Sequence, residues 1–532
     1  MRSFTLLFLF LFFSLLATAQ PRKFDVVVYG GTAGGVMTAV AAAREGLTVA
    51  LLEPTNHLGG MVTGGLSRTD FGKKEVIGAM ALEFYQRAGK KYGRDIEWMP
   101  EPRVAEAILN EMIAEAKTIT VLLNHRLKEK SGVKKQGTRI TEITMENGAR
   151  FVGAIFADAT YEGDLLAQAK VEFTWGRESS AQYGESLAGV RPKDRNHQFD
   201  FAVSAYDENK NHPSGRQLLP EIQKEPRGEI GAGDRKVQAY NFRMILTDDP
   251  TNRLPFAKSS RYDPQRFELA ARWLQGFVKD KGRAPRMNEI LLPAQVAGKQ
   301  KWDFNNRGAF STDYIGKSWD YPNASYKRRA AIALDHKRYT QELFYFLQND
   351  PRVPKETQTE VAPFGIAKDE FTDNDNWPYQ LYVREARRLV GDYVVTQKDI
   401  QTELTKFDVI AMGSYNSDSH NVQRYVTPAG LAQNEGNMEV AVTPYQIPYR
   451  ILLPKKTQAT NLLVPVCFSA SHVTYSTLRM EPQYMMIGQA AGLAAKMAIE
   501  KNVAVQQINT QQLSEKLKSL GAVFEWKKPE TK

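Results

Sequence analysis

The sequence predicts an α/β fold, with a parallel sheet that begins early in the chain and a large α+β region inserted before the sheet closes. An apolar, β-branched run at residues 24–29 is followed by a glycine-rich turn and an alanine-rich stretch, which is the order strand, turn, helix. A second strand follows at 48–52, and a further strand and helix come only at 461–498. With 532 residues, of which 42% are hydrophobic and 24% charged, the chain has core material for several domains and is no disordered or rod-like protein.

Charge and cysteine content exclude several classes of protein. Lysine and arginine number 70 and aspartate and glutamate 60, and the net charge of +10 is spread along the chain, so we expect no nucleic-acid partner. Cys467 is the only cysteine, which excludes an intramolecular disulfide and a four-cysteine iron–sulfur cluster. No H-E-x-x-H or G-x-S-x-G pattern occurs and no G-K-[ST] closes the glycine-rich turn, so we predict no metal site, serine nucleophile or P-loop.

The first 19 residues have the pattern of a signal peptide. Arg2 supplies a basic start, residues 6–16 are leucine and phenylalanine apart from Ser14, and residues 17–19 form a small-x-small cleavage site. The apolar stretch is shorter than the roughly 20 residues of a membrane-spanning helix, and neither a lipoprotein cysteine nor an Arg-Arg pair accompanies it. We therefore expect a mature chain that begins at Gln20, an exported location, periplasmic or secreted, and no membrane span.

The glycine-rich turn predicts a dinucleotide-binding βαβ unit of the Rossmann type. Gly30 permits the tight turn, Gly35 permits close packing of the helix on the strand, and the helix N-terminus offers unpaired N–H groups to a pyrophosphate. Thr32 stands where the G-x-G-x-x-G pattern has its middle glycine. Glu53 lies 23 residues after Gly30, at the end of the second strand, and suits the ribose hydroxyls. The expected contacts to the cofactor come from Gly30, Gly31, Thr32, Ala33, Gly34, Gly35 and Glu53.

The residues after Glu53 favour FAD over NAD. The segment 53–65 is dense in glycine, contains Gly59, Gly60 and Met61, and lacks the apolar helix that continues a plain NAD domain. These residues resemble the two-dinucleotide-binding-domain flavoproteins, the glutathione reductase-like and fumarate reductase-like enzymes. The closer resemblance is to a bacterial FAD-dependent oxidoreductase family near the heterodisulfide reductase group, whose exported members are often labelled xanthan lyase. It implies a Rossmann-like FAD-binding domain of the glutathione reductase type, with FAD bordered by the Gly-Gly pair.

The resemblance covers nearly the whole mature chain. Residues 158–164 resemble the D-A-T-G segment that returns to the FAD, with Tyr161 where many relatives have glycine. Residues 461–466 and 476–498 resemble the closing strand and helix, whose helix N-terminus points at the flavin pyrimidine edge and stabilises negative charge there. Cys467 follows this strand where many relatives place an acid that binds the ribityl chain. The further cofactor contacts that the resemblance implies are Ala159, Thr160, Gly163, Asp164, Gly488 and Gln489.

The predicted organisation has one FAD-binding domain interrupted by a substrate domain. Its parts are a signal peptide at 1–19, the first part of the FAD-binding domain at 20–170, an inserted substrate domain at 171–445, the closing strand and helix at 446–505, and a C-terminal extension at 506–532. Helical spacing of apolar residues in the insert occurs at 264–277, 326–349 and 379–395. Polar segments that mix charged, amide and aromatic groups occur at 303–308, 368–374, 384–388 and 413–420.

Three side chains are candidates for the chemistry, which we expect from both the FAD-binding domain and the insert. His472 precedes the closing helix and His420 lies in the insert, and either histidine suits proton exchange with a substrate hydroxyl or the bracing of a loop. Arg384 and Arg388 are four residues apart in a predicted helix, where they form either a carboxylate clamp or a solvated face. His57 resembles in position the histidine that some fumarate reductase-like proteins link covalently to FAD.

The function that these patterns favour is that of an exported FAD-dependent oxidoreductase. We expect hydride transfer between the flavin and a small, hydroxylated or anionic substrate, with an electron acceptor that the sequence does not name. A polysaccharide lyase and a binding protein, each with structural FAD, are the alternatives. The sequence leaves open the substrate, the direction of reaction, a covalent flavin link and the oligomeric state.

Overall fold

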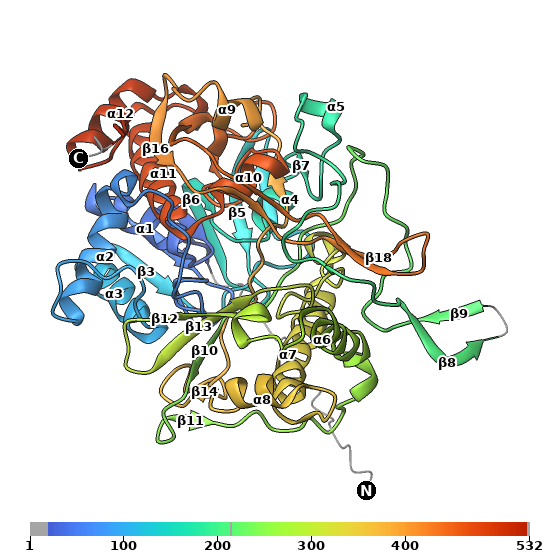
Figure 1. Ribbon diagram of the computed structural model, residues 1–532. Helices are drawn as coiled ribbons and strands as arrows, with labels where there is room; N and C mark the ends of the chain where they lie inside the picture. Colours follow the sequence, from blue (N-terminus) through green and yellow to red (C-terminus); the bar gives the residue numbers. More distant parts are fainter. Residues whose placement is uncertain (1–19, 213–214, 529–532) are drawn as a thin grey trace, which may run out of the picture.

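The computed structural model describes residues 20–212 and 215–528, so the predicted signal peptide, residues 1–19, lies outside the described residues. A seven-stranded sheet forms the centre of one layer (Figure 1). Its strands lie in the order β3-β2-β1-β6-β5-β4, and β22 also pairs with β6. Their bounds are β1 Arg22–Tyr29, β2 Val49–Leu52, β3 Ile119–Leu122, β4 Val133–Gln136, β5 Arg139–Thr144, β6 Arg150–Asp158 and β22 Leu462–Leu463.

The predicted strand, turn and helix at the start of the mature chain are confirmed as β1, α1 (Ala33–Arg44) and β2. β1 runs parallel to β2 and to β6, with Tyr29 opposite Asp158. Residues 26–28 are fully buried, as expected of a parallel strand with both faces covered. The carboxyl ends of β1, β2 and β6 therefore lie together at one edge of the sheet, next to the start of α1.

The closing strand and helix join this layer from the far end of the chain. β22 pairs in parallel with β6, and α11 (Glu481–Lys501) packs against α1. The prediction of one helix at 476–498 is wrong at its start, because α10 (His472–Leu478) ends there and a new helix begins at Glu481. Pro482 explains the break, since proline is tolerated in the first turn of a helix but not in a helix interior.

The insert contains a second sheet of five strands, in the order β11-β14-β10-β13-β12. Their bounds are β10 Met244–Thr247, β11 Arg253–Leu254, β12 Leu291–Gln295, β13 Lys301–Asn306 and β14 Gly365–Ala367. Helices α6 (Glu268–Lys281), α7 (Tyr326–Asn349) and α8 (Lys355–Val361) lie in the same part of the molecule (Figure 1). The helical spacing at 326–349 is confirmed by α7, and that at 264–277 by a short 3₁₀ turn that leads into α6.

The prediction of a helix at 379–395 is wrong. This chain segment is irregular except for β15 (Arg388–Leu389), which pairs with β7 (Phe173–Thr174). Residues 381–389 are all buried, whereas an amphipathic helix would expose one face. The helical spacing is therefore coincidental, and the arginines of the segment are enclosed by acids rather than solvated.

The remaining elements are short helices and two-stranded ladders. The helices are α2 Ala79–Lys91, α3 Pro102–Glu115, α4 Asp164–Gln168, α5 Ser180–Tyr183, α9 Gln397–Gln401 and α12 Thr510–Ser519. The ladders are β8 Tyr206–His212 with β9 Gly215–Leu218, β16 Val409–Gly413 with β21 Tyr445–Pro448, β17 Ser417–Ser419 with β20 Met438–Val440, and β18 Gln423–Val426 with β19 Ala432–Glu435.

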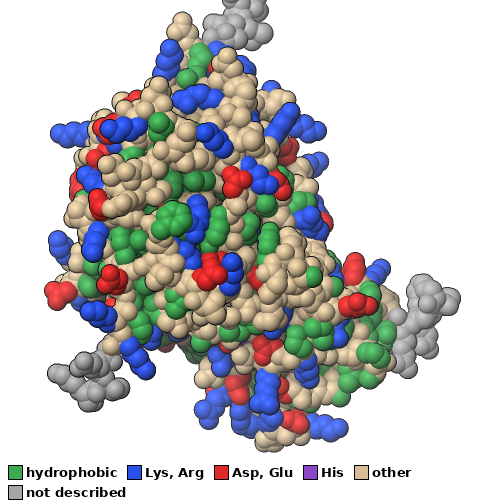
Figure 2. Space-filling view, turned by 90° about the horizontal axis from the view of Figure 1, so that it is seen from above, with side chains coloured by type: hydrophobic (Ala, Val, Ile, Leu, Met, Phe, Trp, Pro, Cys, Tyr) green, Lys and Arg blue, Asp and Glu red, His purple; other side chains and the backbone are tan. Residues whose placement is uncertain are grey.

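In the part of the chain that the structure describes, no helix has the length and apolarity to cross a membrane. Figure 2 shows basic side chains spread over one face with acidic ones among them.

Candidate functional site

The glycine-rich turn packs β1, α1 and β6 closely together. Gly30 has a φ of +103°, and a Cβ there would lie 2.7 Å from the carbonyl carbon of Ala159. A Cβ at Gly35 would collide with the carbonyl oxygen of Gly30, which confirms the close packing predicted for this glycine. The Thr32 hydroxyl accepts the N–H of Gly35 at 3.1 Å and donates to the carbonyl oxygen of Ala159 at 2.8 Å. Thr32 thus caps α1, and the first turn of this helix has the polarity that a phosphate group requires.

Glu53 holds the turn from the end of the neighbouring strand. Its Oε2 accepts the N–H of Gly31 at 2.7 Å, and its Oε1 accepts the N–H of Thr55 at 2.8 Å and the hydroxyl of Thr55 at 2.7 Å. Burial raises the pKa of the Glu53 carboxyl, and the hydrogen bonds from Thr55 and Gly31 oppose that rise. An acid beside the turn is suited to accept hydrogen bonds from ribose hydroxyls.

A cavity of about 260 Å³ opens at this edge of the sheet, and we call it the dinucleotide cavity. Its walls combine Gly30, Thr32, Glu53 and Thr160 from the sheet with Tyr321, Tyr326 and Arg329 from the insert. A glycine turn, a helix N-terminus, an acid for ribose and aromatic rings are groups that suit a dinucleotide. The residues present therefore fit FAD, and the insert covers this site from the side opposite the sheet.

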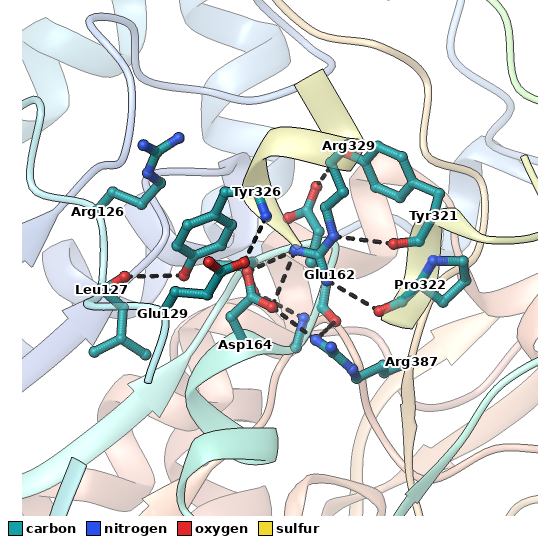
Figure 3. Close-up of polar contacts among 12 residues, drawn as sticks. Arg126, Leu127, Glu129, Glu162, Asp164, Tyr321, Pro322, Tyr326, Arg329 and Arg387 are labelled. Carbon is teal, nitrogen blue, oxygen red and sulfur yellow. Dashed lines mark hydrogen bonds and ion pairs between the residues drawn. The ribbon is translucent and has the colours of Figure 1, made fainter. Parts of the chain in front are cut away.

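Asp164 ties the insert to the nucleotide-binding layer (Figure 3). Its carboxylate lies 2.8 Å from a guanidinium nitrogen of Arg329 on α7 and 2.6 Å from one of Arg387. Burial raises the pKa of Asp164, but the two arginines outweigh burial and hold the pKa below its ordinary value. Tyr326, also on α7, donates its hydroxyl to the carbonyl oxygen of Leu127 at 3.0 Å. Asp164, a predicted cofactor contact, thus lines the cavity and also fastens its far wall; we call Asp164, Arg329 and Arg387 the clasp.

Tyr161, which stands where many relatives have glycine, lies against the Gly-Gly pair. A Cβ at Gly60 would lie 2.5 Å from the Tyr161 hydroxyl, which accepts the N–H of Met61 at 2.9 Å. Gly59 donates its N–H to the carbonyl oxygen of Gly31, in the glycine-rich turn, at 2.6 Å. The Tyr161 hydroxyl donates to Oε1 of Glu481, in the first turn of α11, at 2.8 Å. Burial raises the pKa of Glu481 to about 8, so this acid is mostly protonated at neutral pH.

Several predicted cofactor contacts contribute to packing. Gly488 of α11 faces Gly34 of α1, where a Cβ at Gly488 would collide with the carbonyl oxygen of Gly34. Gln489 accepts the N–H of Met80 at 3.0 Å, which joins α11 to the start of α2. Gly163 has a φ of +68° at the N-cap of α4. The structure therefore gives Gly488 and Gln489 a place in the helix interface rather than in the lining of the dinucleotide cavity.

The sequence also matches a known family. The model of a family described as FAD dependent oxidoreductase matches residues 25–517. The chain belongs to this family. The family description names FAD as the cofactor, and the dinucleotide cavity, whose lining suits FAD, is the candidate site for it.

Several solved structures resemble limited parts of this chain. L-proline dehydrogenase from P. horikoshii is 14% identical over 30% of this chain and 59% of its own, with a TM-score of 0.24. Thioredoxin reductase from T. acidophilum is 21% identical over 26% and 36% of the two chains, with a TM-score of 0.17. A flavin monooxygenase variant from Stenotrophomonas maltophilia is 19% identical over 26% and 38%, with a TM-score of 0.20. The chain spans less than two thirds of each of these proteins, and no curated protein matches its sequence.

A second cavity, of about 200 Å³, is lined mainly by polar side chains, and we call it the polar cavity. Residues of the polar segments 303–308 and 413–420 meet here, together with Arg68 and Asp70. One chain segment, from Glu53 to Asp70, contributes residues to the lining of both this cavity and the dinucleotide cavity.

His420 alone among the three predicted catalytic residues lines the polar cavity. Its Nδ1 lies 2.6 Å from Oδ2 of Asp313, and Oδ1 of Asp313 lies 3.1 Å from Nη2 of Arg384. Burial, and then the charge of Arg384, lower the pKa of His420 to about 3, although Asp313 opposes the shift. The histidine is therefore neutral near pH 7. Because the carboxylate accepts from Nδ1, we assign the proton to Nδ1, which leaves Nε2 as a proton acceptor.

Arg384 has a different environment from the one predicted. It is fully buried in an irregular segment, and its guanidinium contacts Asp313 and donates to the carbonyl oxygen of Ala239. Arg384 and Arg388 therefore share no helix face, and Arg388 pairs with Glu178 and Glu385 instead. Arg384 positions the Asp313 carboxylate rather than lining a cavity.

His472 lies in a separate, closed cluster. Its Nδ1 is 2.7 Å from Oε2 of Glu385, and its backbone N–H donates to Oε2 of Glu178 at 2.9 Å. Burial and the charge of Arg388 lower its pKa to about 3. His472 lines neither the dinucleotide cavity nor the polar cavity, so the structure favours the bracing role over the catalytic one.

His57 contacts carboxylates through both ring nitrogens. Nδ1 lies 2.9 Å from Oε1 of Glu106 and Nε2 lies 3.1 Å from Oδ2 of Asp373. The ring stacks on Tyr379, with ring centroids 3.3 Å apart. Carboxylates thus contact both ring nitrogens in this arrangement, which does not favour a covalent flavin link through His57.

Sequence reasoning missed Asp313 and Asp418. Oδ2 of Asp418 lies 4.0 Å from Nε2 of His420 at the polar cavity, and burial raises the pKa of Asp418 to about 7. Asp418 lies among amide and aromatic residues in the polar segment 413–420, and this pattern in the sequence could have identified it as a candidate site residue. No pattern in the neighbouring sequence marks Asp313 as a site residue, because its partners His420 and Arg384 are distant in sequence.

Proposed function

We propose that this protein is an exported oxidoreductase that transfers a hydride between FAD and a small, hydroxylated or anionic substrate bound in the polar cavity. The observation that carries the proposal is the His420–Asp313 pair, which presents a neutral imidazole to a polar cavity whose lining shares the chain segment 53–70 with the dinucleotide cavity. FAD, when bound, supplies a hydride acceptor or donor at N5 of its isoalloxazine ring.

In this proposal His420 handles the proton of the substrate hydroxyl. In the direction of oxidation the O–H bond breaks and its proton passes to Nε2 of His420, the adjacent C–H bond breaks with loss of a hydride, and a C=O bond forms. Asp313 stabilises the imidazolium that results and fixes the ring orientation. Burial raises the pKa of Asp313, but Arg384 and then His420 outweigh burial and lower that pKa to about 2. Asp313 is therefore ionised near pH 7.

Arg68 supports an anionic substrate, because it lines the polar cavity and its guanidinium forms no ion pair with any described residue. Asp303 accepts the backbone N–H of Arg68 at 2.9 Å through one carboxylate oxygen. Its other oxygen lies 2.9 Å from Nε of Arg243. Asp303 thus fixes both arginine positions at the wall of the polar cavity.

The exported location rests on residues 1–19, whose basic start, apolar stretch and small-x-small site have the pattern of a signal peptide. The test is expression of the full chain in a bacterial host, followed by fractionation and N-terminal sequencing. A periplasmic or secreted product that begins at Gln20 supports export, and a cytoplasmic product that keeps residues 1–19 contradicts it.

The test of the chemistry is the absorbance spectrum of the protein from Gln20 onward, before and after denaturation and filtration. We expect oxidised-flavin bands that pass the filter as free FAD and that bleach when a substrate from a panel of sugars and organic acids is added anaerobically. Flavin that no compound bleaches contradicts hydride transfer and favours a lyase or a binding protein. Bands retained with the protein indicate covalently linked flavin and make His57 the first residue to examine.

A further inference from the structure

The polar cavity contains buried polar atoms that lack a protein partner. Oδ1 of Asn305 and Nδ1 of His197 form no hydrogen bond with any described residue, and both residues line the cavity. A buried polar atom without a partner costs about 1–3 kcal/mol. These atoms therefore mark positions where a bound molecule supplies the missing groups, and hydroxyl groups can supply them.

Two arginines at the opening of the cavity carry unpaired charge. Arg68 and Arg307 line the cavity and are exposed, and within residues 20–212 and 215–528 neither side chain forms an ion pair. A carboxylate within reach of two such guanidinium groups gains charge-assisted hydrogen bonds at little cost in desolvation.

The carboxylates of the cavity, by contrast, already have partners. Asn196 donates to Oε2 of Glu439 at 2.9 Å, and Arg479 approaches Oδ2 of Asp418 at 3.8 Å. Asp70 interacts with the hydroxyl of Tyr415. The lining carboxylates thus have donors within the protein, whereas Arg68 and Arg307 have no carboxylate partner among the described residues.

The size and composition of the cavity limit the ligand further. Leu292 is the one aliphatic side chain in the lining, so the cavity gives little surface to an apolar ligand. A volume of about 200 Å³ suits a single sugar unit rather than a polymer segment. An adjoining cavity of about 320 Å³ shares His197, Arg307 and Glu439 with it and leaves space for a substituent.

We infer that the polar cavity binds a sugar acid, whose carboxylate is held by Arg68 and Arg307 and whose hydroxyls meet Asn305, His197 and the Asp418 carboxyl. The inference rests on the proposed function, because the hydroxyl next to His420 is the one to be oxidised. The sugar acid is either free or the end unit of an acidic oligosaccharide that continues into the adjoining cavity.

Calorimetric titration of the FAD-loaded protein tests the ligand class without relying on turnover. The probes are D-glucuronate, D-galacturonate and D-gluconate as sugar acids, D-glucose as the neutral sugar, and succinate as an acid without hydroxyls. We expect at least one sugar acid to bind at least tenfold more tightly than glucose and succinate. Equal binding of glucose, or tighter binding of succinate, overturns the inference. A digalacturonate that binds more tightly than galacturonate identifies the oligosaccharide end as the source, and equal affinity identifies the free sugar acid.

Three variants separate the contributions of charge and of hydrogen bonding. Arg307→Gln and Arg68→Gln are each expected to weaken sugar-acid binding about tenfold and to leave glucose binding unchanged, because only the acid carries the charge they hold. Asn305→Leu is expected to weaken both ligands. Arg328→Gln, at an exposed arginine of α7 outside the cavity, is the matched control and is expected to change neither. Equal losses for acid and glucose in the arginine variants overturn the assignment of the carboxylate.

The outcome of this test is distinguishable from that of the proposed function. Sugar-acid binding that does not bleach the flavin supports the ligand class and contradicts hydride transfer. Bleaching by a neutral alcohol, in a protein that binds none of the sugar acids, supports hydride transfer and overturns the inference.

Discussion

Nδ1 of His420 lies 2.6 Å from Oδ2 of Asp313, and Arg384 approaches the other oxygen of that carboxylate at 3.1 Å. Three residues from distant parts of the sequence thus form one chain of charge and hydrogen bonds, which begins at buried Arg384 and Asp313 and ends with half-buried His420 at the polar cavity. Because Asp313 binds Nδ1, the imidazole directs its other nitrogen away from the carboxylate and keeps it free for a substrate proton. This geometry supports the proton-exchange role that we propose for His420 over the loop-bracing alternative.

Replacing His420 with glutamine removes this proton acceptor and keeps a polar side chain of similar reach. We expect the rate of flavin bleaching by a substrate to fall by about 10²–10⁴-fold, the usual contribution of a positioned acid or base. The measurement is anaerobic stopped-flow absorbance at saturating substrate. FAD content should stay at the level of the unaltered protein, since His420 does not line the dinucleotide cavity. An unchanged bleaching rate means that another group takes the proton.

Glu53→Gln tests the assignment of the ribose acid. The variant keeps the shape of the side chain but loses the charge that strengthens its hydrogen bonds, which are worth about 1.5–3 kcal/mol for a charged acceptor. We expect FAD to bind about 10–100-fold more weakly in a fluorescence titration of the apoprotein. Glu111→Gln, at an exposed pair with Lys91, is the control and should bind FAD normally. Equal affinity in both variants contradicts a ribose contact at Glu53.

Gly488→Ala tests the contact between α1 and α11. A methyl group at Gly488 collides with the carbonyl oxygen of Gly34, a backbone atom that cannot rotate away. We expect a loss of about 1–3 kcal/mol in the free energy of unfolding, measured by urea denaturation. Gly228→Ala is the matched control. Gly228 is exposed, and a Cβ there would lie 3.2 Å from a methyl group of Val190, so we expect little change in the free energy of unfolding. Similar stabilities of the two variants would show that the helices can separate freely.

The pKa of Glu481 predicts a pH dependence of stability. Burial raises this pKa to about 8 in the folded protein, against 4.5 for the free side chain, so the folded state favours the protonated acid. The contribution of Glu481 to stability is therefore present below about pH 4.5 and declines as the pH rises through 8.

Glu481→Gln copies the protonated acid and can still accept the Tyr161 hydroxyl. We expect it to match the unaltered protein near pH 5 and to exceed it at pH 8.5, by an amount on the order of a few kcal/mol. Thermal unfolding of the FAD-loaded protein across this range is the measurement. A constant difference at every pH contradicts the assigned ionisation of Glu481.

The nucleotide-binding half of the fold could be predicted because its determinants are local. Gly30, Gly35 and Glu53 act within a stretch of about 25 residues, and each needs only its own strand or helix to be recognised. The closing helix could also be predicted from its small residues, although its start could not, because the break at Pro482 falls inside a stretch whose apolar pattern is continuous.

The substrate side could not be predicted to the same depth, because its contacts join distant segments. Asp313 meets His420 across 107 residues, and no spacing rule connects them. The error at Arg384 has a related cause: helical spacing of apolar residues indicates an amphipathic helix, whereas the segment is buried on all sides and its charges are satisfied by partners from elsewhere in the chain.

We expect retention of FAD to depend on the clasp, whose ion pair with Arg329 lies outside the nucleotide-binding sheet. Arg329 of α7 is buried and paired with Asp164, while its neighbour Arg328 is exposed and paired with exposed Asp320. Breaking a buried pair leaves an uncompensated charge and costs about 3–5 kcal/mol, whereas an exposed pair contributes about 0–1 kcal/mol. Two adjacent arginines of one helix therefore form a matched pair for experiment.

Arg329→Gln is expected to loosen the N-terminal turn of α7, because Asp164 then keeps only Arg387 as a cationic partner. Since this turn forms one wall of the dinucleotide cavity, FAD should dissociate at least tenfold faster, and the free energy of unfolding should fall by an amount on the order of 3 kcal/mol. Recovery of flavin fluorescence after dilution gives the dissociation rate. Arg328→Gln should change neither quantity. Loss of stability in Arg329→Gln at an unchanged FAD dissociation rate would mean that the clasp serves the fold alone, whereas faster release would show that the insert holds the cofactor in place.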